Sequence, residues 1–176
     1  NRYSGAGSGE APLHKLGSGQ WEKVCRKAKS RITDVAAEIL EIYAKREMQS
    51  GRIISANDDS YSVFSDQFDY EETVDQESAI QEVINDLQSG KPMDRLICGD
   101  VGFGKTEVAM RAIFLAVNSG YQVAVLVPTT LLARQHYETF CTRFSGWPIN
   151  IAKLSRLQSR TVASDVRNDI AVGAVD

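Results

Sequence analysis

One run of eight residues carries the clearest chemical pattern in the sequence. Residues 99–106 read Gly-Asp-Val-Gly-Phe-Gly-Lys-Thr and match the phosphate-binding pattern G-x-x-x-x-G-K-[ST] at every fixed position. Glycines let the backbone turn tightly and aim several N–H groups at one anion, and a helix that begins at Lys105 adds its positive end. Lys105 then binds the β- and γ-phosphates, and the Thr106 hydroxyl binds Mg²⁺. The residues that we expect to bind a nucleoside triphosphate are Gly99, Asp100, Val101, Gly102, Phe103, Gly104, Lys105 and Thr106, the last two being the catalytic pair and Thr106 the metal ligand.

The segments around this loop predict a parallel sheet. Residues 94–98 are a short apolar strand before the loop, and residues 121–127 are β-rich and nearly all apolar, which is typical of a strand buried on both faces. Residues 149–154 are a third strand candidate. The helices expected between and after these strands cover residues 105–118, 131–144 and 158–171. Such alternation predicts an α/β fold with a parallel sheet and right-handed crossovers.

The first half of the chain has a different character. Residues 1–19 are rich in Gly and Ser and predict a loop. Residues 20–49 carry apolar side chains three or four apart and no Gly or Pro, which predicts one helix about 45 Å long. Residues 51–75 are polar and acidic, and residues 74–88 predict a second helix.

Composition sets the class of protein. The 176 residues are 43% hydrophobic and 24% charged, as in an ordinary globular domain, which excludes a disordered chain and a collagen-like chain. No apolar run approaches a membrane span, and no signal peptide begins the sequence. Cys25, Cys98 and Cys141 are too widely spaced for a zinc site or a disulfide framework, so we expect free thiols and a cytoplasmic protein without membrane contact. Residues 95–176 carry nine basic and six acidic side chains, which suits a phosphate-rich ligand.

The phosphate-binding loop does not decide the reaction by itself, because kinases, GTPases, transporters and motor ATPases share it. A GTPase needs an N-K-x-D segment, which the sequence lacks. The residues around the loop carry a more specific likeness. Four segments together resemble the bacterial transcription-repair coupling factor family: residues 94–112, 122–137, 11–17 and 34–38.

That resemblance implies a fold and a function. It implies a truncated RecA-like P-loop motor lobe with a parallel sheet, preceded by a long linker helix. Residues 1–19 would end a polymerase-interacting domain, residues 20–50 would be the linker helix, and residues 51–176 would be an incomplete first motor lobe. The whole protein would use ATP and Mg²⁺ to move on double-stranded DNA, displace stalled RNA polymerase and recruit the excision-repair protein UvrA for nucleotide excision repair.

The resemblance also assigns residues outside the loop. Thr73 and Gln76 match the segment that reads adenine, and Phe68 would pack near the base; Val74 departs from the proline usual in the family. An amide such as that of Gln76 both donates to and accepts from an adenine edge. The residues that match DNA-contacting segments of the family are Pro128, Thr129, Thr130, Ser155 and Arg156. Without the family, Thr129 and Thr130 would be interpreted as a helix cap.

Hydrolysis and two alternatives remain open at this point. ATP hydrolysis in this class needs an acidic pair at the end of a strand. Asp176 ends an apolar run but has no second acid after it, so we do not interpret it as part of the pair. Nor do we assign Glu107, because the first turn of a helix favours Glu through the dipole alone. We therefore expect the chain by itself to bind nucleotide weakly and to hydrolyse essentially none. The alternatives are a RecG-like fork-remodelling helicase and a non-catalytic adapter that keeps a P-loop fold for partner binding.

Overall fold

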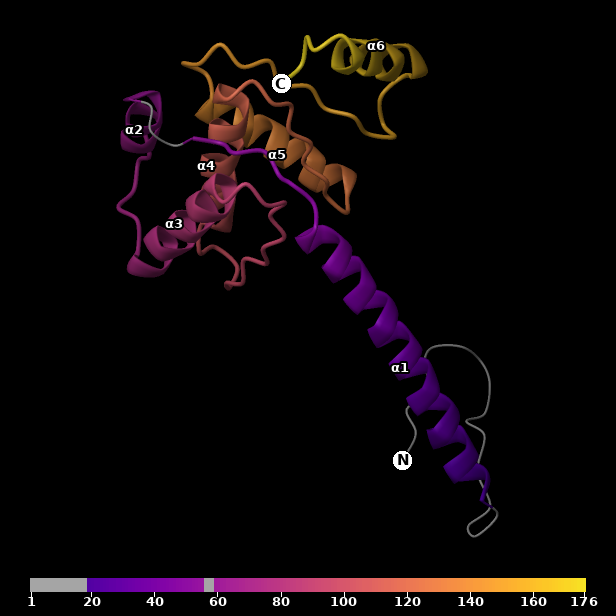
Figure 1. Ribbon diagram of the computed structural model, residues 1–176. Helices are drawn as coiled ribbons and strands as arrows, with labels where there is room; N and C mark the ends of the chain where they lie inside the picture. Colours follow the sequence, from indigo (N-terminus) through magenta and orange to yellow (C-terminus); the bar gives the residue numbers. More distant parts are fainter. Residues whose placement is uncertain (1–18, 56–58) are drawn as a thin grey trace. The chain divides into compact units, whose positions relative to one another are not determined.

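Figure 1 shows the computed structural model of the chain, which describes residues 19–55 and 59–176. Two compact units divide the chain, residues 1–49 and residues 50–176. Each unit is described by itself. The predicted loop over residues 1–19 and the family-like residues 11–17 lie outside the described residues, apart from Gly19.

The described part of the first unit is one long helix, α1 (Gln20–Glu47), as the apolar spacing predicts. None of its 28 residues is buried, so its apolar side chains are exposed. Lys45 and Glu41 form an i,i+4 ion pair on its surface. No described helix of the chain is both long enough and apolar enough to cross a membrane.

Helix α4 (Lys105–Asn118) is central to the core of the second unit. Helix α3 (Val74–Gln88) packs against it, and so does the short helix α2 (Asp59–Asp66), which lies in the acidic segment where we predicted no helix. One apolar cluster joins α3 and α4 through Ile80, Val83, Ile84, Val108 and Leu115. A second cluster, on the other side of α4, contains Phe64, Met110, Phe114, Phe140 and Phe144. Since α4 has apolar side chains toward both clusters, the helix that follows the phosphate-binding loop is held on two sides.

The second cluster is built on stacked aromatic rings. Phe64 of α2 is fully buried and stacks on Phe114 with ring centroids 4.3 Å apart and planes 6° apart. Phe144 also stacks on Phe64, with ring centroids 5.2 Å apart. Phe144 directly follows α5 (Thr130–Arg143), so this stack ties α2, α4 and α5 together.

The predicted parallel sheet is wrong for the described residues, which form six helices and no strand. Segments 94–98, 121–127 and 149–154 are non-helical, but their backbones do not pair residue after residue, as a ladder requires. Two isolated backbone hydrogen bonds join them to the last residue, from Val123 N to Asp176 O at 2.7 Å and from Asp176 N to Asn150 O at 3.0 Å.

The exposure of the side chains in these segments also argues against a sheet. The side chain of Leu126 is 98% exposed, where the all-apolar pattern predicted burial on both faces. Apolar and β-branched residues favour an extended backbone, but ladder partners decide whether that backbone becomes a strand.

The helices predicted after the loop are confirmed. Helix α4 has the predicted bounds, α5 begins one residue before its predicted start, and α6 (Arg160–Ala171) lies within its predicted range. Side-chain oxygens of Thr129 and Ser159 cap α5 and α6 by accepting from the N–H groups of Leu132 and Val162.

Candidate functional site

The loop of residues 99–104 has a backbone that its glycines make possible. Gly102 and Gly104 have φ values of +88° and +69°, in the left-handed region that other residues rarely adopt. Gly104 is also the N-cap of α4, so the loop leads directly into a helix N-terminus. This is the arrangement that binds phosphate through backbone N–H groups.

Lys105 points back into this loop. Its Nζ donates to the carbonyl oxygens of Gly99 and Asp100, at 2.6 Å in each case. A lysine ammonium is a compact charge on a flexible stem, so it can exchange these carbonyls for phosphate oxygens. Thr106 is half-buried in the first turn of α4. The loop, Lys105 and Thr106 therefore fit a nucleoside triphosphate with Mg²⁺, which usually keeps few protein ligands beside the phosphates.

Gln76 connects the predicted adenine-reading segment to the loop. Its Nε2 donates to the carbonyl oxygen of Phe103 at 3.0 Å, across 27 positions of sequence. Its Oε1 accepts from Thr73 N at 2.9 Å, and Thr73 Oγ1 accepts from Gln76 N, which completes a capping box at the start of α3. A Cβ added at Gly104 would lie 2.3 Å from Gln76 Nε2, so a side chain at this position would displace the Gln76 amide from the loop.

Phe68 lies next to charged side chains. Its ring packs edge-on against Tyr70, with centroids 5.6 Å apart. The guanidinium carbons of Arg111 and Arg143 each lie 5.9 Å from the Phe68 ring centroid. The predicted adenine contact of Phe68 is not tested by these contacts and stays a prediction.

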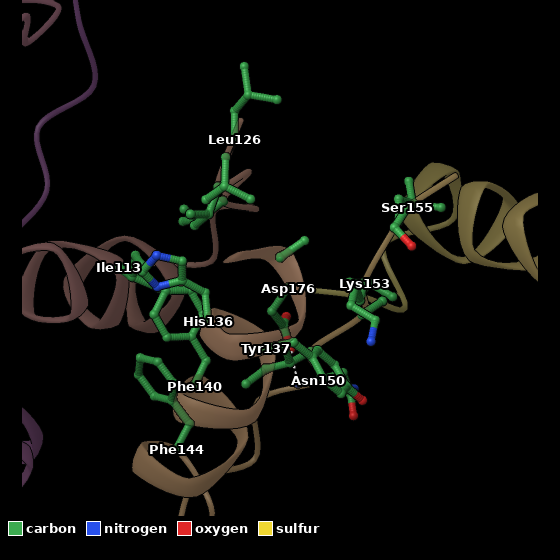
Figure 2. Close-up of a pocket in the computed structure, with 18 of the residues that line it drawn as sticks. Ile113, Leu126, His136, Tyr137, Phe140, Phe144, Asn150, Lys153, Ser155 and Asp176 are labelled. Atoms are coloured by element: carbon green, nitrogen blue, oxygen red, sulfur yellow. Dashed lines mark hydrogen bonds between the residues drawn. The ribbon is translucent and has the colours of Figure 1, made fainter. Parts of the chain in front are cut away.

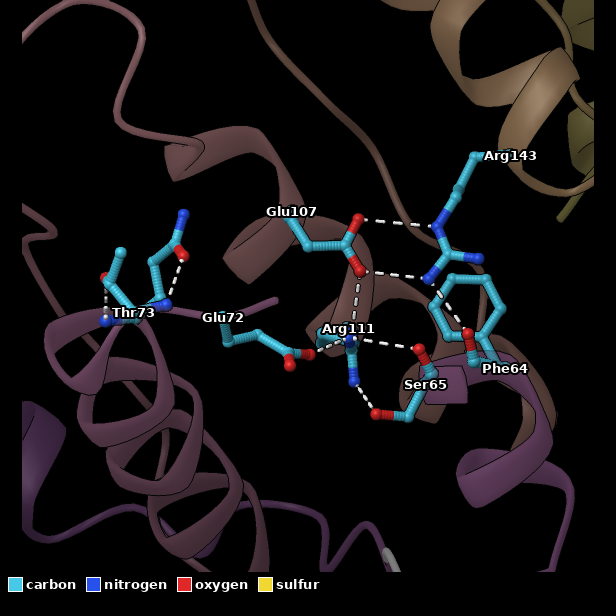
Figure 3. Close-up of polar contacts among 8 residues, drawn as sticks. Phe64, Ser65, Glu72, Thr73, Glu107, Arg111 and Arg143 are labelled. Carbon is cyan, nitrogen blue, oxygen red and sulfur yellow. Dashed lines mark hydrogen bonds and ion pairs between the residues drawn. The ribbon is translucent and has the colours of Figure 1, made fainter. Parts of the chain in front are cut away.

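A buried ionic network lies under this site, one turn beyond the loop (Figure 3). Glu107 is only 4% exposed, and its Oε1 accepts from Arg111 Nε at 2.6 Å and from Arg143 Nη2 at 2.9 Å. Arg143 Nη2 also donates to the Phe64 carbonyl oxygen at 2.8 Å. Helices α2, α4 and α5 are thereby joined through one carboxylate.

Arg111 extends the network toward the adenine-reading segment. It donates to the Ser65 hydroxyl at the end of α2 and to the carboxylate of Glu72, which immediately precedes Thr73. Burial opposes its charged form, but the hydrogen bond and the charge of Glu107 outweigh this and raise the pKa of Arg111 above its usual value. Arg111 is therefore a buried cation with two counter-ions, Glu107 and Glu72.

The network is the functional feature that sequence reasoning missed. The dipole explanation accounts for a Glu in the first turn of α4 but not for its burial. Glu107 and Arg111 are spaced i,i+4 on a helix predicted to be mostly apolar, which is the one signal that indicated a pair. With both arginines bound to it, Glu107 has no carboxylate oxygen free of a guanidinium partner.

The residues predicted to contact DNA gather around a second place in the same unit. They line one cavity of about 600 Å³, formed by residues 123–130, helix α5 and residues 149–156 (Figure 2). Phe140, Phe144 and other apolar side chains also line it, and the Lys153 ammonium lies 5.0 Å from the Tyr137 ring centroid. The predicted residues that line this cavity are Pro128, Thr129, Thr130, Ser155 and Arg156.

The contacts inside the protein explain several of these residues without DNA. Thr129 is the N-cap of α5, which is the role expected for it without the family resemblance. Ser155 N donates to Gln158 Oε1 at 2.8 Å, and Arg156 is exposed. The residues predicted to contact DNA come from two segments 25 positions apart in sequence, and both segments line this cavity. Their contact with DNA stays a prediction.

The loop of residues 99–106 indicates a class of nucleotide-binding proteins, and comparison with known proteins narrows that class. Residues 73–174 match the DEAD/DEAH box helicase family, so the chain belongs to that family, whose motor domains have a RecA-like fold.

The most similar relatives narrow the class. The chain is 52% identical to the transcription-repair-coupling factor of Haemophilus influenzae and 49% identical to that of Escherichia coli, over all of its length in both cases. It spans 15% of each of these relatives. It also resembles a solved structure described as RecG bound to a three-way DNA junction, with a TM-score of 0.68 and 35% identity over 73% of this chain and 18% of that one. The resemblance to transcription-repair coupling factors is thus confirmed.

Proposed function

We propose that this chain is the nucleotide-binding part of an ATP-driven translocase on double-stranded DNA, of the transcription-repair coupling kind. The observation that carries the proposal is the hydrogen bond from Gln76 to the Phe103 carbonyl. It brings the segment that matches the family's adenine reader against the loop that fits the phosphates, so one nucleotide can span both.

The residues have separate roles in this proposal. Lys105 neutralises the β- and γ-phosphates, and Thr106 holds Mg²⁺. The loop N–H groups bind phosphate oxygens, while Gln76 recognises adenine and Phe68 packs near it. Backbone contacts from Pro128, Thr129, Thr130, Ser155 and Arg156 position the DNA without reading its sequence.

The remaining parts of the proposal concern the whole protein. Its relatives are named for coupling transcription to repair. We propose that the whole protein displaces stalled RNA polymerase, recruits the excision-repair protein UvrA and acts in the cytoplasm. The 176 residues alone are proposed to bind ATP and to hydrolyse essentially none. Rapid DNA-stimulated hydrolysis by these residues alone would contradict that part.

Lys105→Ala in the full-length protein tests the main proposal. Loss of a charge that is directed at the transferred phosphate should reduce DNA-stimulated ATP hydrolysis by about 100-fold or more and stop translocation. Arg52→Gln is the matched control, because it removes one exposed positive charge outside the site. A full-length protein that shows no ATP-driven translocation, and whose partner binding Lys105→Ala leaves unchanged, would favour the non-catalytic adapter.

The likeness to RecG supports one alternative within the same class. That solved structure contains a three-way DNA junction, so a fork-remodelling helicase is the second candidate. ATP hydrolysis measured with linear and with branched duplexes separates the two. Equal stimulation by linear DNA supports the translocase, and a requirement for branched DNA supports the helicase.

A further inference from the structure

Three arginines surround a second cavity next to the predicted DNA residues. The cavity has a volume of about 630 Å³ and is lined by residues of the 154–160 segment and of α6. Arg156, Arg160 and Arg167 are all exposed and all line it. The remaining lining residues are Leu154, Ser155, Gln158 and Ala163, so none of the lining side chains is acidic.

The charges of α6 are separated by face. With about 3.6 residues per turn, Arg160, Ala163 and Arg167 lie on one side of the helix, toward the cavity. Asp165 and Asp169 fall on the opposite side. The positive charges of α6 are therefore concentrated where the cavity is.

The cavity arginines also differ from the other arginines of this unit in their partners. Within residues 59–176, none of the three cavity arginines lies within ion-pair distance of an acidic side chain. Four others in that range are paired with carboxylates: Arg95, Arg111, Arg134 and Arg143. Three unpaired guanidinium groups around one cavity repel each other, and an anion between them removes that repulsion.

The two cavities share one segment of their lining. Leu154, Ser155 and Arg156 line both of them. The first cavity also contains Thr129 and Thr130 at the start of α5. A long anion that contacts these threonines and Arg156 could therefore extend along the shared segment to the arginines of α6.

We propose that Arg160 and Arg167, together with Arg156, form a second binding site for the phosphodiester backbone of DNA, which extends the proposed contact at Thr129, Thr130 and Ser155. The proposal rests on the proposed DNA translocase function. The guanidinium group suits this ligand because its planar fork binds two phosphate oxygens at once. The N-terminus of α6 is already capped by Ser159, so the arginines carry the site.

Salt dependence of DNA binding tests this site in the full-length protein. The variant is Arg160→Gln with Arg167→Gln, and the measurement is fluorescence anisotropy with a labelled linear duplex between about 50 and about 200 mM salt. Loss of two phosphate contacts should lower the magnitude of the log–log salt slope by about two and weaken binding roughly tenfold, equally for unrelated sequences.

Two control variants separate the site from general charge. Arg160→Lys with Arg167→Lys keeps the charges and should keep the salt slope while weakening binding less. Arg52→Gln removes an exposed positive charge elsewhere in the unit and should leave the slope unchanged. A drop in slope with Arg52→Gln equal to that of one cavity arginine would overturn the site, because net charge alone would then explain the effect.

The outcomes also distinguish this site from the proposed function. If the wild-type protein binds no DNA, the proposed function fails and this inference falls with it. If the wild type binds DNA and the double Gln variant binds with the same slope, only this inference is overturned. This inference alone is also overturned if the double Gln variant binds DNA normally but no longer displaces RNA polymerase. That result would assign the arginines to contact with an acidic protein surface.

Discussion

The proposed nucleotide site and the proposed DNA site of the second unit hold their side chains in opposite ways. Around the phosphate-binding loop, Lys105 and Gln76 already have hydrogen-bond partners within the protein. Around the second cavity, Arg156, Arg160 and Arg167 are exposed, and none of them has an acidic partner among the residues that the structure describes. The proposed site for the compact ligand is therefore organised by contacts within the protein, while the proposed site for the long polyanion consists of unpaired surface charges.

Burial is the physical reason for the difference. A charge near the core needs a fixed counter-ion, as Glu107 provides for Arg111 and Arg143, because burying an unpaired charge is costly. A charge in water can remain unpaired at little cost and is free to bind phosphate. Substitutions on the two sides should therefore affect different properties, stability on one and salt-dependent binding on the other.

The largest effect on stability is expected from Glu107→Gln. It leaves two guanidinium groups without their shared anion, one of them buried, and should lower the free energy of unfolding by about 3–5 kcal/mol. Urea unfolding followed by circular dichroism measures this. Glu138→Gln is the matched control, because Glu138 forms an i,i+4 pair with Arg134 that is exposed, and we expect no measurable change.

Equal losses of stability in Glu107→Gln and Glu138→Gln would break the comparison. They would show that the buried network adds nothing that an exposed pair does not.

Next in size is Gly104→Ala, compared with Gly102→Ala. Both introduce a side chain at positive φ, which costs about 1–2 kcal/mol. Only at Gly104 does the added Cβ meet Gln76, whereas open space surrounds Gly102. We expect a larger loss of ATP affinity for Gly104→Ala, measured by titration calorimetry; equal losses would mean that the Gln76 contact does not shape the site.

Gln76→Ala should have a more specific effect. Loss of the amide removes the proposed adenine contact and the bond to Phe103, and should weaken ATP binding about tenfold with a smaller change for GTP. Competition between the two nucleotides measures the selectivity. Gln76→Glu keeps the acceptor that caps Thr73 but not the donor, so unchanged selectivity in that variant would contradict the proposed role of the amide.

The smallest effect is expected from Thr129→Ala on the DNA side. Loss of the α5 cap should cost about 1 kcal/mol of stability, while Thr129→Ser should keep the cap. DNA affinity should fall only a few-fold, because one hydroxyl contact is lost and no charge. A loss of salt slope as large as that for an arginine variant would show that the cap positions the charged residues as well.

Local residue patterns predicted most of the helices and the loop. The period of apolar residues predicted α1, α3 and α4, and the glycines of residues 99–104 predicted a turn that needs positive φ. Helix α2 was missed because its eight residues are too few for a clear period and lie in an acidic segment. Its Phe64 is nonetheless the centre of an aromatic stack, since burial depends on neighbours that are distant in sequence.

The sequence alone determined the phosphate-binding loop, the helices with regular apolar spacing and the family resemblance, because each depends on residues close together along the chain. Tertiary structure decided three other matters: the absence of paired strands in the described residues, the burial of Glu107 between two arginines, and the cavity shared by α6 with residues 154–156. These depend on which distant groups meet. Backbone pairing, counter-ion placement and unbalanced surface charge are properties of pairs and groups of residues, and no single segment encodes them.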